Sequence, residues 1–526
     1  MLHTPRAFRG MVTSPHHLAS QAGLSVLQEG GNAAEAAVAT ASCLAVVYPH
    51  MTGIGGDSFW LVAEPSGDVW SVQACGAAAR RAELDLYQGF TSVPWRGPLA
   101  ANTVAGTISG WELLLKRAGG RLPLSRLLRD AIHYAEAGVA VTRGGAEIAA
   151  AKDAELRDAP GYAAVFRPDG APLIEGQRLR QPALAQTLRR VAEKGCADFY
   201  SGGLAADIAA DLDAAGSPVV AADLAAHRAE IKAPLSVGIR GAHLFNMAPP
   251  TQGLSSLLIL ALFDRLGVHE GESFAHIYGL VEATKAAFAR SRALNLGDPA
   301  FMKGDAQKLL DDASAIDAMA ARIDPRKTQS WDQVTEPGDT TWFGAIDADG
   351  RAVSAIQSIY FEFGSGVVLP QTGIVWQNRG ASFQLAPSGW NALAPGRLPF
   401  HTLNPAIARF DDGRVMAYGA MGGEGQPQTQ AAVFTRYALF GDGLQEAVSA
   451  PRWLLGRTWG EESMSLKFED RFDAELYEAM RAAGHQVELL APFTSTMGHA
   501  GALVRSASGM IEGACDPRSD GAVAAW

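Results

Sequence analysis

Apolar residues recur at helical spacing through much of the first two thirds of the chain. From about residue 104 to residue 320 they repeat every three or four positions, which predicts amphipathic helices. The predicted helices cover residues 104–117, 124–136, 181–194, 203–214, 254–266, 274–296 and 308–319. Nearer the start, the alanine-rich run 33–47 is apolar on most sides and predicts a buried helix, followed by two strands at 59–63 and 69–74.

The pattern changes after residue 340, where short runs of strand-forming residues replace most of the helical periods. The predicted strands cover residues 341–346, 352–358, 406–410, 414–420, 466–469, 486–491, 500–505 and 510–514. Helices are expected between them, at 428–440, 443–450 and 474–483. Strands grouped around a few helices predict an α+β protein with stacked antiparallel sheets covered by helices, rather than a doubly wound parallel sheet.

Composition narrows the class of function. The chain has 526 residues, of which 48% are hydrophobic and 19% charged, as expected for a globular protein with a large core. The formal net charge of −11, without long basic runs, argues against nucleic acid or an anionic membrane as the main partner. No stretch of about twenty apolar residues predicts a membrane span. The partner we expect is a small molecule.

The cysteines and the first residues of the chain indicate the cellular compartment of the protein. The four cysteines are scattered without a Cys-x-x-Cys pair, which favours a reducing compartment and predicts no zinc site. The first ten residues lack the apolar core of a signal peptide. A cytoplasmic location is the resulting expectation.

The dipeptide Thr340-Thr341 lies where a polar stretch meets a strand. Residues 320–339 contain Pro325 and Pro337 and predict an exposed linker that ends at this pair. A threonine there can attack its own preceding peptide bond, and its freed α-amine can then serve as the base for the same hydroxyl. The alternative is an ordinary threonine pair at a strand entrance, because threonine has high β-propensity.

Two glycine turns are further candidates for chemistry. The turn 52–57 contains Gly-x-Gly-Gly, but its order of helix, turn and strand differs from the strand, turn and helix of a dinucleotide fingerprint. The turn 421–425 follows a strand and precedes a helix, so its amides can bind developing negative charge, or it is only a tight connection. The histidines show no metal-ligand spacing, and only His401 lies among other candidate residues.

Four motifs, taken together in order and spacing, carry a resemblance that spans nearly the whole chain. They are Gly30-Gly31-Asn32-Ala33-Ala34-Glu35 running on to Thr52–Asp57, then Asn102–Gly106 with Gly110-Trp111, then Thr340-Thr341 with Phe363–Gly366, and finally Met421-Gly422-Gly423 with Asp516-Pro517-Arg518. In these motifs the chain resembles the γ-glutamyltranspeptidase family of N-terminal-nucleophile hydrolases.

The resemblance implies a fold, a cleavage and a catalytic set. The implied fold is the four-layer αββα sandwich. Thr340 would be both the autoprocessing residue and the nucleophile, and cleavage between Asp339 and Thr340 would give a large subunit, 1–339, and a small subunit, 340–526, that together form one domain. Gly422 and Gly423 would supply the oxyanion-hole amides, and Ser358 takes the place of the family threonine that holds the nucleophile's amine. No cofactor and no metal are implied.

The substrate pocket departs from the family pattern. By resemblance, members that bind γ-glutamyl groups hold the α-carboxylate with an arginine and a serine pair, and the α-ammonium with an asparagine, a glutamine and an aspartate. The corresponding positions here are Cys75, His401-Thr402, Tyr360, Arg379 and Ser382. An arginine repels an ammonium and suits a carboxylate, and a tyrosine in place of an asparagine makes the pocket smaller.

We therefore expect a small carboxylate-bearing amide without an α-amino group. This looks most like the oxamate amidohydrolase branch of the family, which is associated with purine catabolism. Alternatively, Arg379 only pairs with a nearby carboxylate such as Glu362 or Glu424. Other hypotheses are γ-glutamyl transfer or hydrolysis on glutathione-type substrates, cleavage of a bulkier acyl amide, and a silent homologue that binds without catalysis. The two subunits are expected as a heterodimer, with a heterotetramer as the alternative.

Overall fold

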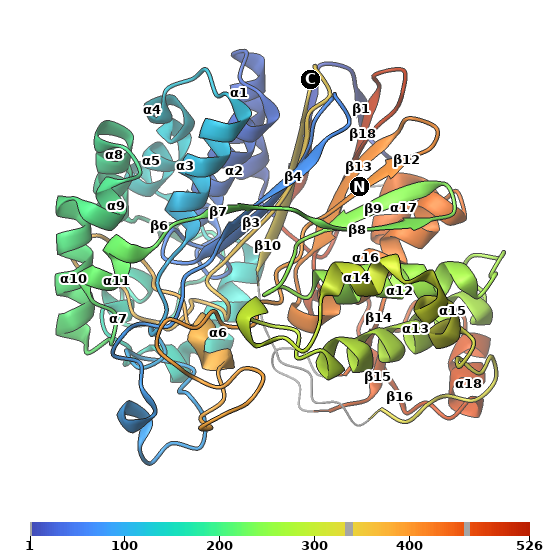
Figure 1. The fold of residues 1–526 in the computed structure, drawn as a ribbon. Coiled ribbons are helices and arrows are strands. Elements are labelled where there is room, and N and C mark those ends of the chain that lie inside the picture. Colours follow the sequence, from blue (N-terminus) through green and yellow to red (C-terminus); the bar gives the residue numbers. More distant parts are fainter. Residues whose placement is uncertain (1–2, 332–339, 457–462) are drawn as a thin grey trace.

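A computed structural model describes residues 3–331, 340–456 and 463–526, and in it two large β-sheets pack face to face between layers of helices. Figure 1 shows these layers edge-on, with the helices of the first half of the chain on one side and most helices of the second half on the other. The arrangement is the four-layer αββα sandwich expected from the sequence. Every pair of neighbouring strands within the two sheets is antiparallel.

The first sheet combines strands from both sides of Thr340. Its order is β19-β2-β10-β11-β3-β4-β7. The strands are β19 (Ala522–Ala525), β2 (Gly10–Ser14), β10 (Thr341–Asp347), β11 (Ala352–Ser358), β3 (Asp57–Ala63), β4 (Val69–Ala74) and β7 (Glu230–Lys232). The central strands β10, β11 and β3 are buried along their whole length, because helices cover one face and the second sheet covers the other.

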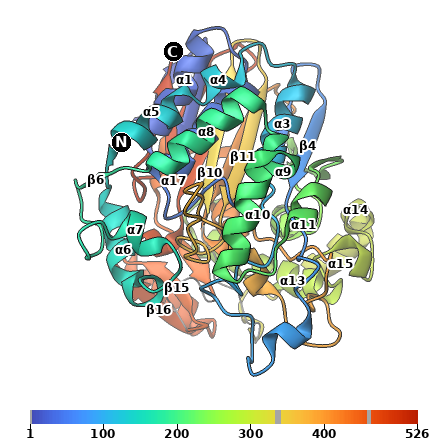
Figure 2. The same cartoon turned by 90° about the vertical axis from the view of Figure 1, so that its left-hand side faces the viewer.

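Helices from the first half of the chain cover the outer face of the first sheet (Figure 2). The alanine-rich helix α2 (Ala33–Val47) is buried along its whole length and packs against β10 and β11. Its N-terminus is closed by a capping box between Asn32 and Glu35, which satisfies amides that the helix itself leaves unpaired. The other helices of this layer and its surroundings are α1 (His17–Gln28), α3 (Thr107–Ala118), α4 (Leu124–Leu127), α5 (Arg129–Ala137), α6 (Arg143–Leu156), α7 (Tyr162–Phe166), α8 (Pro182–Lys194), α9 (Asp198–Ser201), α10 (Gly203–Ala215) and α11 (Ala221–Ala226).

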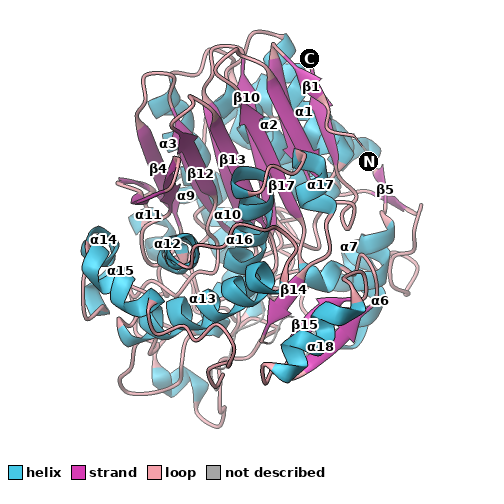
Figure 3. Ribbon diagram, turned by 90° about the vertical axis from the view of Figure 1, so that its right-hand side faces the viewer, coloured by secondary structure: helices cyan, strands magenta, loops and turns pink. Residues whose placement is uncertain are grey.

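The second sheet also takes strands from both halves of the chain. Its order is β1-β18-β17-β13-β12-β9-β8. The strands are β1 (Arg6–Ala7), β18 (Ile511–Cys515), β17 (Ala500–Arg505), β13 (Val415–Ala420), β12 (Ala406–Phe410), β9 (Ala242–Asn246) and β8 (Leu235–Ile239). Figure 3 shows the helices that cover its outer face, among them α12 (Gly253–Arg265), α16 (Gln426–Phe434) and α17 (Leu444–Ser449).

Smaller elements complete the chain. A three-stranded sheet consists of β14 (Trp453–Leu455), β15 (Leu466–Glu469) and β16 (Val487–Leu490), and a two-stranded sheet of β5 (Val139–Ala140) and β6 (Arg178–Leu179). The remaining α-helices are α13 (Phe274–Ala293), α14 (Ala306–Asp311), α15 (Ala313–Ala320) and α18 (Ala474–Ala482). Short helical turns are η1 (Leu84–Tyr87), η2 (Pro299–Phe301), η3 (Arg379–Ser382), η4 (Gly423–Gly425), η5 (Thr435–Leu439) and η6 (Ser495–Met497).

Trp342 fixes the contact between the two sheets. Its indole Nε1 donates to the Ser354 hydroxyl at 2.9 Å, and that hydroxyl donates to the Tyr418 carbonyl of the facing sheet at 3.1 Å. A Cβ atom built at Gly419 or at Gly501 would stand 2.1 or 2.3 Å from the Trp342 ring, so only glycine leaves room for it. The start of β10 is therefore held against the end of β13.

The structure confirms most of the predicted elements. Strands β4, β11, β12, β15 and β17 have the expected bounds, and the other predicted strands differ by one or two residues at an end. The expected helix 124–136 divides into α4 and α5, and the expected helix 308–319 divides where Asp312 caps α15. The expected helix 428–440 begins earlier, as α16, and ends in the π-helical turn η5.

The mainly helical prediction for 104–320 is wrong at five strands. Strands β5 and β6 form the two-stranded sheet, and three others, β7, β8 and β9, join the two large sheets. These three are only three to five residues long, and β9 pairs with β12, which lies about 160 residues away. The pattern also does not predict β2, β19, α1 and α6. Strand β2 is buried on both faces, so it lacks the alternation of apolar and polar residues that marks a half-buried strand.

Two further findings concern membrane-spanning helices and the state of the cysteines. Among the helices that the structure describes, none has the length and apolar character needed to cross a membrane. Cys43, Cys75, Cys196 and Cys515 are all buried and free.

Candidate active site

Thr340 lies directly before β10 and is buried, with 1% of its surface exposed. Its hydroxyl donates to the Gln357 carbonyl at 3.2 Å, and the hydroxyl of Thr341 donates to the same carbonyl at 2.8 Å. Neighbouring residues of a strand face opposite sides of the sheet. Thr340 therefore shares the inter-sheet side with Trp342, whereas Thr341 faces the helix layer.

Strand register places four polar or reactive side chains in one row. Thr341 pairs with Gln357, so one further step along these antiparallel strands puts Thr340 opposite Ser358. Ser358 pairs with Asp57 of β3, and the register of β3 with β4 continues from Asp57 to Cys75. Directly paired residues point to the same face of a sheet. Thr340, Ser358, Asp57 and Cys75 thus form a row at the edge of the inter-sheet space, which we call the strand-end row.

The Ser358 hydroxyl lies opposite Thr340 in the strand-end row. It accepts a hydrogen bond from the Tyr360 amide at 2.8 Å, which orients the side chain. This is the location expected for the group that holds the amine of the nucleophile.

The glycine turn after β13 lies at the same end of the two sheets as Thr340. Trp342 of β10 contacts Gly419 of β13, so the residues just before β10 and just after β13 lie at the same edge. Gly422 has φ +117° and Gly423 has φ +55°, a conformation that side-chain-bearing residues rarely adopt. The turn leads through η4 into α16, so its amides lie at a helix N-terminus, where developing negative charge is stabilised.

Gln252 ties this turn to the opposite wall of the site. Its side-chain Nε2 donates to the Gly423 carbonyl at 2.8 Å and to the Thr402 carbonyl at 2.6 Å. Its backbone amide donates to the His401 carbonyl at 3.0 Å. One buried side chain therefore positions both the glycine turn and the segment that contains His401 and Thr402.

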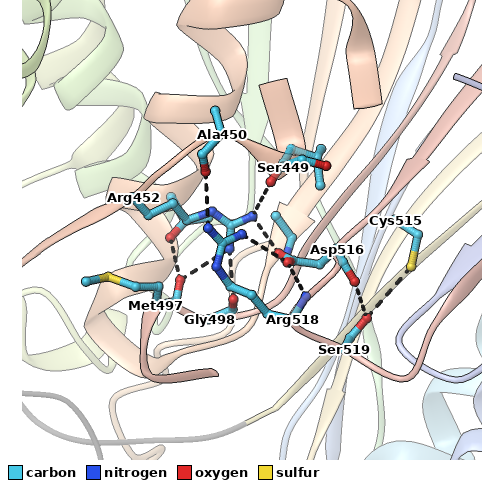
Figure 4. Close-up of polar contacts among 12 residues, drawn as sticks. Ser449, Ala450, Arg452, Met497, Gly498, Cys515, Asp516, Arg518 and Ser519 are labelled. Carbon is cyan, nitrogen blue, oxygen red and sulfur yellow. Dashed lines mark hydrogen bonds and ion pairs between the residues drawn. The ribbon is translucent and has the colours of Figure 1, made fainter. Parts of the chain in front are cut away.

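A buried cluster of charged side chains, shown in Figure 4, contacts the backbone on which the glycine turn packs. Arg452 and Arg518 both pair with Asp516, at 2.5 and 3.1 Å, and Arg518 also pairs with Glu469. Burial alone would raise the pKa of Asp516, but the two arginines lower it to about 2. The cluster is therefore fully ionised at neutral pH.

The charge cluster acts on the turn through residues 497–500. Arg452 donates to the Gly498 carbonyl at 2.8 Å, and Asp516 accepts from the Ala500 amide at 2.6 Å. The Met421 amide donates to the His499 carbonyl at 2.9 Å, and Gly422 packs closely on Gly498. Loss of the cluster would free the backbone that supports the oxyanion turn.

Arg379 and Tyr360 are buried side chains that stack on each other close to Ser358 in the chain. The Arg379 guanidinium lies 3.5 Å from the centre of the Tyr360 ring and donates to the Thr402 hydroxyl at 3.4 Å and the Phe400 carbonyl at 3.2 Å. Tyr360 has φ +81°, a strained value for a residue with a large side chain. The strain orients the ring under the guanidinium, two residues after Ser358.

The structure bears on the alternative pairing of Arg379. Glu362 lies 3.6 Å from Arg96, and Glu424 lies 3.5 Å from Arg292. Each of the two carboxylates that could have neutralised Arg379 therefore has another arginine beside it. Pairing with these residues is not needed to explain where the Arg379 side chain lies.

His401 lies in the segment between β11 of the first sheet and β12 of the second sheet. Its ring is fully buried, packs on Phe59 and has its Nε2 atom 3.7 Å from Oδ2 of Asp57. Burial, and after it the charge of Arg379, holds the pKa of His401 well below its usual range. The imidazole is thus neutral at physiological pH.

Cys75 and Ser382 have less direct roles. Cys75 ends the strand-end row, and burial raises the pKa of its thiol well above the usual value, so it is a poor nucleophile. Ser382 is buried at the end of η3, where its carbonyl accepts from the Asn391 side chain at 2.7 Å. The structure therefore places Ser382 on the same short turn as Arg379, with Asn391 as its described partner.

Some residues of the site were missed from the sequence. Asp57 was visible only as the last residue of a glycine turn, and its place beside Ser358 depends on strand pairing. Gln252 carries no motif signal that could have identified it. Among the described residues, no group of His, Cys, Asp and Glu could hold a metal ion. The arrangement instead brings together a buried threonine hydroxyl and a glycine turn at a helix N-terminus, which are groups of the kind that serve acyl transfer as nucleophile and oxyanion hole.

Comparisons with known proteins agree with this geometry. The family model described as gamma-glutamyltranspeptidase matches residues 19–526. The chain is 53% identical to the oxamate amidohydrolase proenzyme of Klebsiella pneumoniae over 521 residues, which is 98% of each chain. It is 41% identical to a glutathione hydrolase-like proenzyme of Bacillus subtilis over 522 residues, 97% of each chain.

A solved structure supports the fold independently. The crystal structure of cephalosporin acylase from Bacillus halodurans superposes with a TM-score of 0.91 at 32% sequence identity. The match covers 100% of this chain and 97% of that one. The αββα sandwich is therefore shared over its full length.

Replacing Arg452 with methionine is expected to destabilise the protein strongly. The change leaves Asp516 buried with one arginine instead of two, and breaking a buried ion pair costs about 3–5 kcal/mol. Thermal unfolding should show a clearly lowered midpoint. Arg143→Met is the control, because its side chain is 77% exposed and its loss should cost under about 0.5 kcal/mol. Equal midpoints for both variants would contradict the supporting role of the cluster.

Proposed function

Since the chain belongs to the γ-glutamyltranspeptidase family, we propose that it is an autoprocessing amidohydrolase that cleaves a small carboxylate-bearing amide such as oxamate. The observation that carries the choice of substrate is the buried Arg379, stacked on Tyr360 beside the strand-end row. The 53% identity to an oxamate amidohydrolase proenzyme supports the same substrate.

The first reaction in this proposal is the cut before Thr340. The Thr340 hydroxyl attacks the carbonyl carbon of Asp339, a residue that lies outside the described part of the chain. The peptide C–N bond breaks as the ester forms, and water then releases the carboxyl group of residue 339. The products are a large subunit, 1–339, and a small subunit, 340–526, whose Thr340 now has a free α-amine. Because both sheets take strands from both subunits, the pair stays together as one domain.

Acylation uses the freed amine as the base. The Thr340 α-amine, held by the Ser358 hydroxyl, takes the proton from Oγ1 as that oxygen attacks the substrate's amide carbonyl. The carbonyl oxygen gains negative charge, which the Gly422 and Gly423 amides stabilise. The same amine then gives the proton to the leaving nitrogen, which departs as ammonia and leaves an acyl ester on Thr340.

Deacylation repeats the cycle with water. The amine takes a proton from water as the oxygen attacks the ester carbonyl, and the oxyanion forms again in the glycine turn. Collapse breaks the bond to Oγ1, which regains the proton. With oxamate and water as reactants, the products are oxalate and ammonia.

The pocket suits a short, anionic acyl group. By resemblance, the arginine that holds a glutamyl α-carboxylate is replaced by Cys75 at the far end of the strand-end row. Arg379 instead brings a positive charge to the part of the pocket next to Tyr360 and Thr402. A guanidinium there favours a carboxylate and disfavours an ammonium group.

A reducing compartment agrees with the free thiols. All four cysteines are buried and unpaired, which is usual for proteins of the cytoplasm. We therefore place the enzyme in the cytoplasm, in the purine nitrogen catabolism with which the oxamate branch is associated.

Substitution of Thr340 tests the processing step. Wild-type protein should give two bands on a denaturing gel, of the sizes of 1–339 and 340–526, whereas Thr340→Ala should give one uncut band. Thr340→Ser keeps a hydroxyl and should be cut. A single band from wild-type protein after prolonged incubation would favour a silent binding homologue.

The choice of substrate is tested by two parallel assays of wild-type protein. Ammonia release from oxamate is expected, and nitroaniline release from a γ-glutamyl anilide is expected to be negligible, because the anilide carries an α-ammonium. Turnover of the anilide without turnover of oxamate would refute the proposed substrate. A cephalosporin side-chain amide serves as a third arm for bulkier acyl groups.

Arg379 should contribute mainly to substrate binding. Arg379→Met removes a charge-assisted hydrogen bond of about 1.5–3 kcal/mol, so KM for oxamate should rise roughly 10- to 150-fold with a smaller change in kcat. Arg379→Lys keeps the charge without the planar fork. Its KM for oxamate should lie between the values of wild-type protein and Arg379→Met. Processing on a gel is the control. An unchanged KM in Arg379→Met would remove Arg379 from the pocket's function.

A further inference from the structure

Asp57 lies in the strand-end row two strands away from the nucleophile. Ser358 stands between them, and neighbouring strands are about 4.8 Å apart, so the Cα atoms of Thr340 and Asp57 are separated by roughly 10 Å. Both side chains point into the space between the sheets. Asp57 therefore faces the pocket that holds the acyl group of the substrate.

One oxygen of Asp57 is fixed by the backbone. Its Oδ1 accepts from the Gly76 amide at 3.1 Å and from the Gly106 amide at 3.0 Å. A Cβ atom at Gly76 would lie 1.8 Å from the Val104 carbonyl oxygen, so this close approach requires glycine. The second oxygen, Oδ2, is turned away from these amides toward His401.

The atoms that face each other in this gap have no hydrogen-bond partners. Oδ2 of Asp57 and both ring nitrogens of His401 are buried without one, although the two residues are only 1% and 0% exposed. Their separation of 3.7 Å is too long for a direct hydrogen bond. Each such unsatisfied group costs about 1–3 kcal/mol, and native structures seldom keep several of them together without a reason.

The surroundings allow Asp57 to be uncharged. Burial raises its pKa to about 7, against the lowering effect of the Gly76 amide, the Gln377 side chain, the charge of Arg379 and the Gly106 amide. The groups whose charge bears on it are His401, Arg379 of η3, the Cys75 thiol after β4 and Tyr200 of α9. Cys75 and Tyr200 have raised pKa values and His401 a lowered one, so all three are neutral near pH 7 and Arg379 is the one cation of the set.

We propose that Asp57 and His401 form a specificity element that binds the substrate's carboxylate opposite Arg379, with Asp57 as a neutral carboxylic acid that donates a hydrogen bond. The inference rests on the proposed function, adds Asp57 to its pocket and gives His401 a defined role there. Arg379 balances the charge of the carboxylate, and the neutral pair satisfies its remaining lone pairs. An ionised Asp57 would instead repel the substrate.

The distance along the row limits the size of the acyl group. A reacting carbon lies about 3 Å from the nucleophile, and a hydrogen bond to Asp57 takes about another 2.8 Å. Of the roughly 10 Å between the strands, only a few ångströms remain. A carboxylate bonded directly to the reacting carbonyl, at about 1.5 Å, fits this space.

The proposal predicts how the affinity for the anion changes with pH. Below about pH 7 Asp57 is already protonated, so binding of the anion needs no proton from solution. Above that pH, binding must first protonate Asp57, so each bound ligand takes up a proton and affinity falls about tenfold per pH unit. The α-amine of processed Thr340 and the second charge of a dianion such as oxalate can also cause proton uptake near this pH, so the uptake due to Asp57 is the part that is lost in Asp57→Asn.

Calorimetric titration with oxalate, the product expected from oxamate, tests this on the processed protein. Measurements at pH 6 and pH 8, each in two buffers of different protonation enthalpy, give the number of protons taken up. For a pKa of about 7, Asp57 should contribute an uptake of about 0.1 proton at pH 6 and 0.9 at pH 8 in wild-type protein, with about tenfold weaker binding at pH 8. Asp57→Asn should lose this uptake and bind with less than about twofold change over the same range.

Asp347→Asn is the matched control. Asp347 is also a buried carboxyl with a raised pKa, but it lies at the opposite end of β10, where it accepts from the Ala33 amide at 2.8 Å. This variant should keep the wild-type uptake. His401→Gln retains Asp57 and should weaken oxalate binding at least about fivefold while keeping the uptake, because the amide places its donor and acceptor at other positions than the two imidazole nitrogens.

The outcomes separate the two proposals. Equal proton uptake in wild type and Asp57→Asn, unchanged affinity in His401→Gln, or no binding of oxalate to processed wild-type protein would overturn the role of the pair. Asp57-dependent uptake in a protein that does not hydrolyse oxamate would support the pair and refute the proposed substrate. If Asp57→Asn fails to fold, the His401→Gln titration still decides.

Discussion

The antiparallel pairing of β10 with β11 is the interaction on which the site depends. It sets Thr340 opposite Ser358, and the next pairing, of β11 with β3, adds Asp57 to the same row. A slip of one residue would turn every side chain of a strand to the other face. Thr340 would then face the helix layer. Trp342 prevents this, because its ring fills space that only Gly419 and Gly501 leave open.

The same pairing explains how the domain can tolerate a cut before Thr340. The cut falls before the first residue of β10, so no bond of the ladder is broken. Both sheets contain strands from the two sides of the cut, and the buried cluster of Arg452, Asp516 and Arg518 lies wholly on one side. Cleavage thus changes the chemistry at one atom, the nitrogen of Thr340, while the packed layers around it stay as they were.

Local signals made much of this predictable from the sequence. Short strand patterns after residue 340 predicted stacked antiparallel sheets covered by helices, and the family resemblance predicted the four-layer sandwich and proposed Thr340, Gly422, Gly423 and Ser358 as site residues. The parts that were not predicted depend on distant pairing. Strands β7, β8 and β9 lie among helical periods and are stabilised by partners far along the chain. Asp57 and Gln252 became recognisable only when their neighbours in space were known.

Charge balance connects these distant residues into one selective pocket. Arg379 contributes one positive charge and His401 is held neutral. Asp57 is neutral below its pKa of about 7. A substrate with a single negative charge makes such a buried site neutral overall, and burial of unbalanced charge is costly. A glutamyl group brings an ammonium as well as a carboxylate, and its ammonium would meet a cation instead of an acidic partner. In the proposed site, selection would thus depend on the charges around Arg379, Asp57 and His401, whereas the proposed nucleophile, Thr340, would not need to change with the substrate.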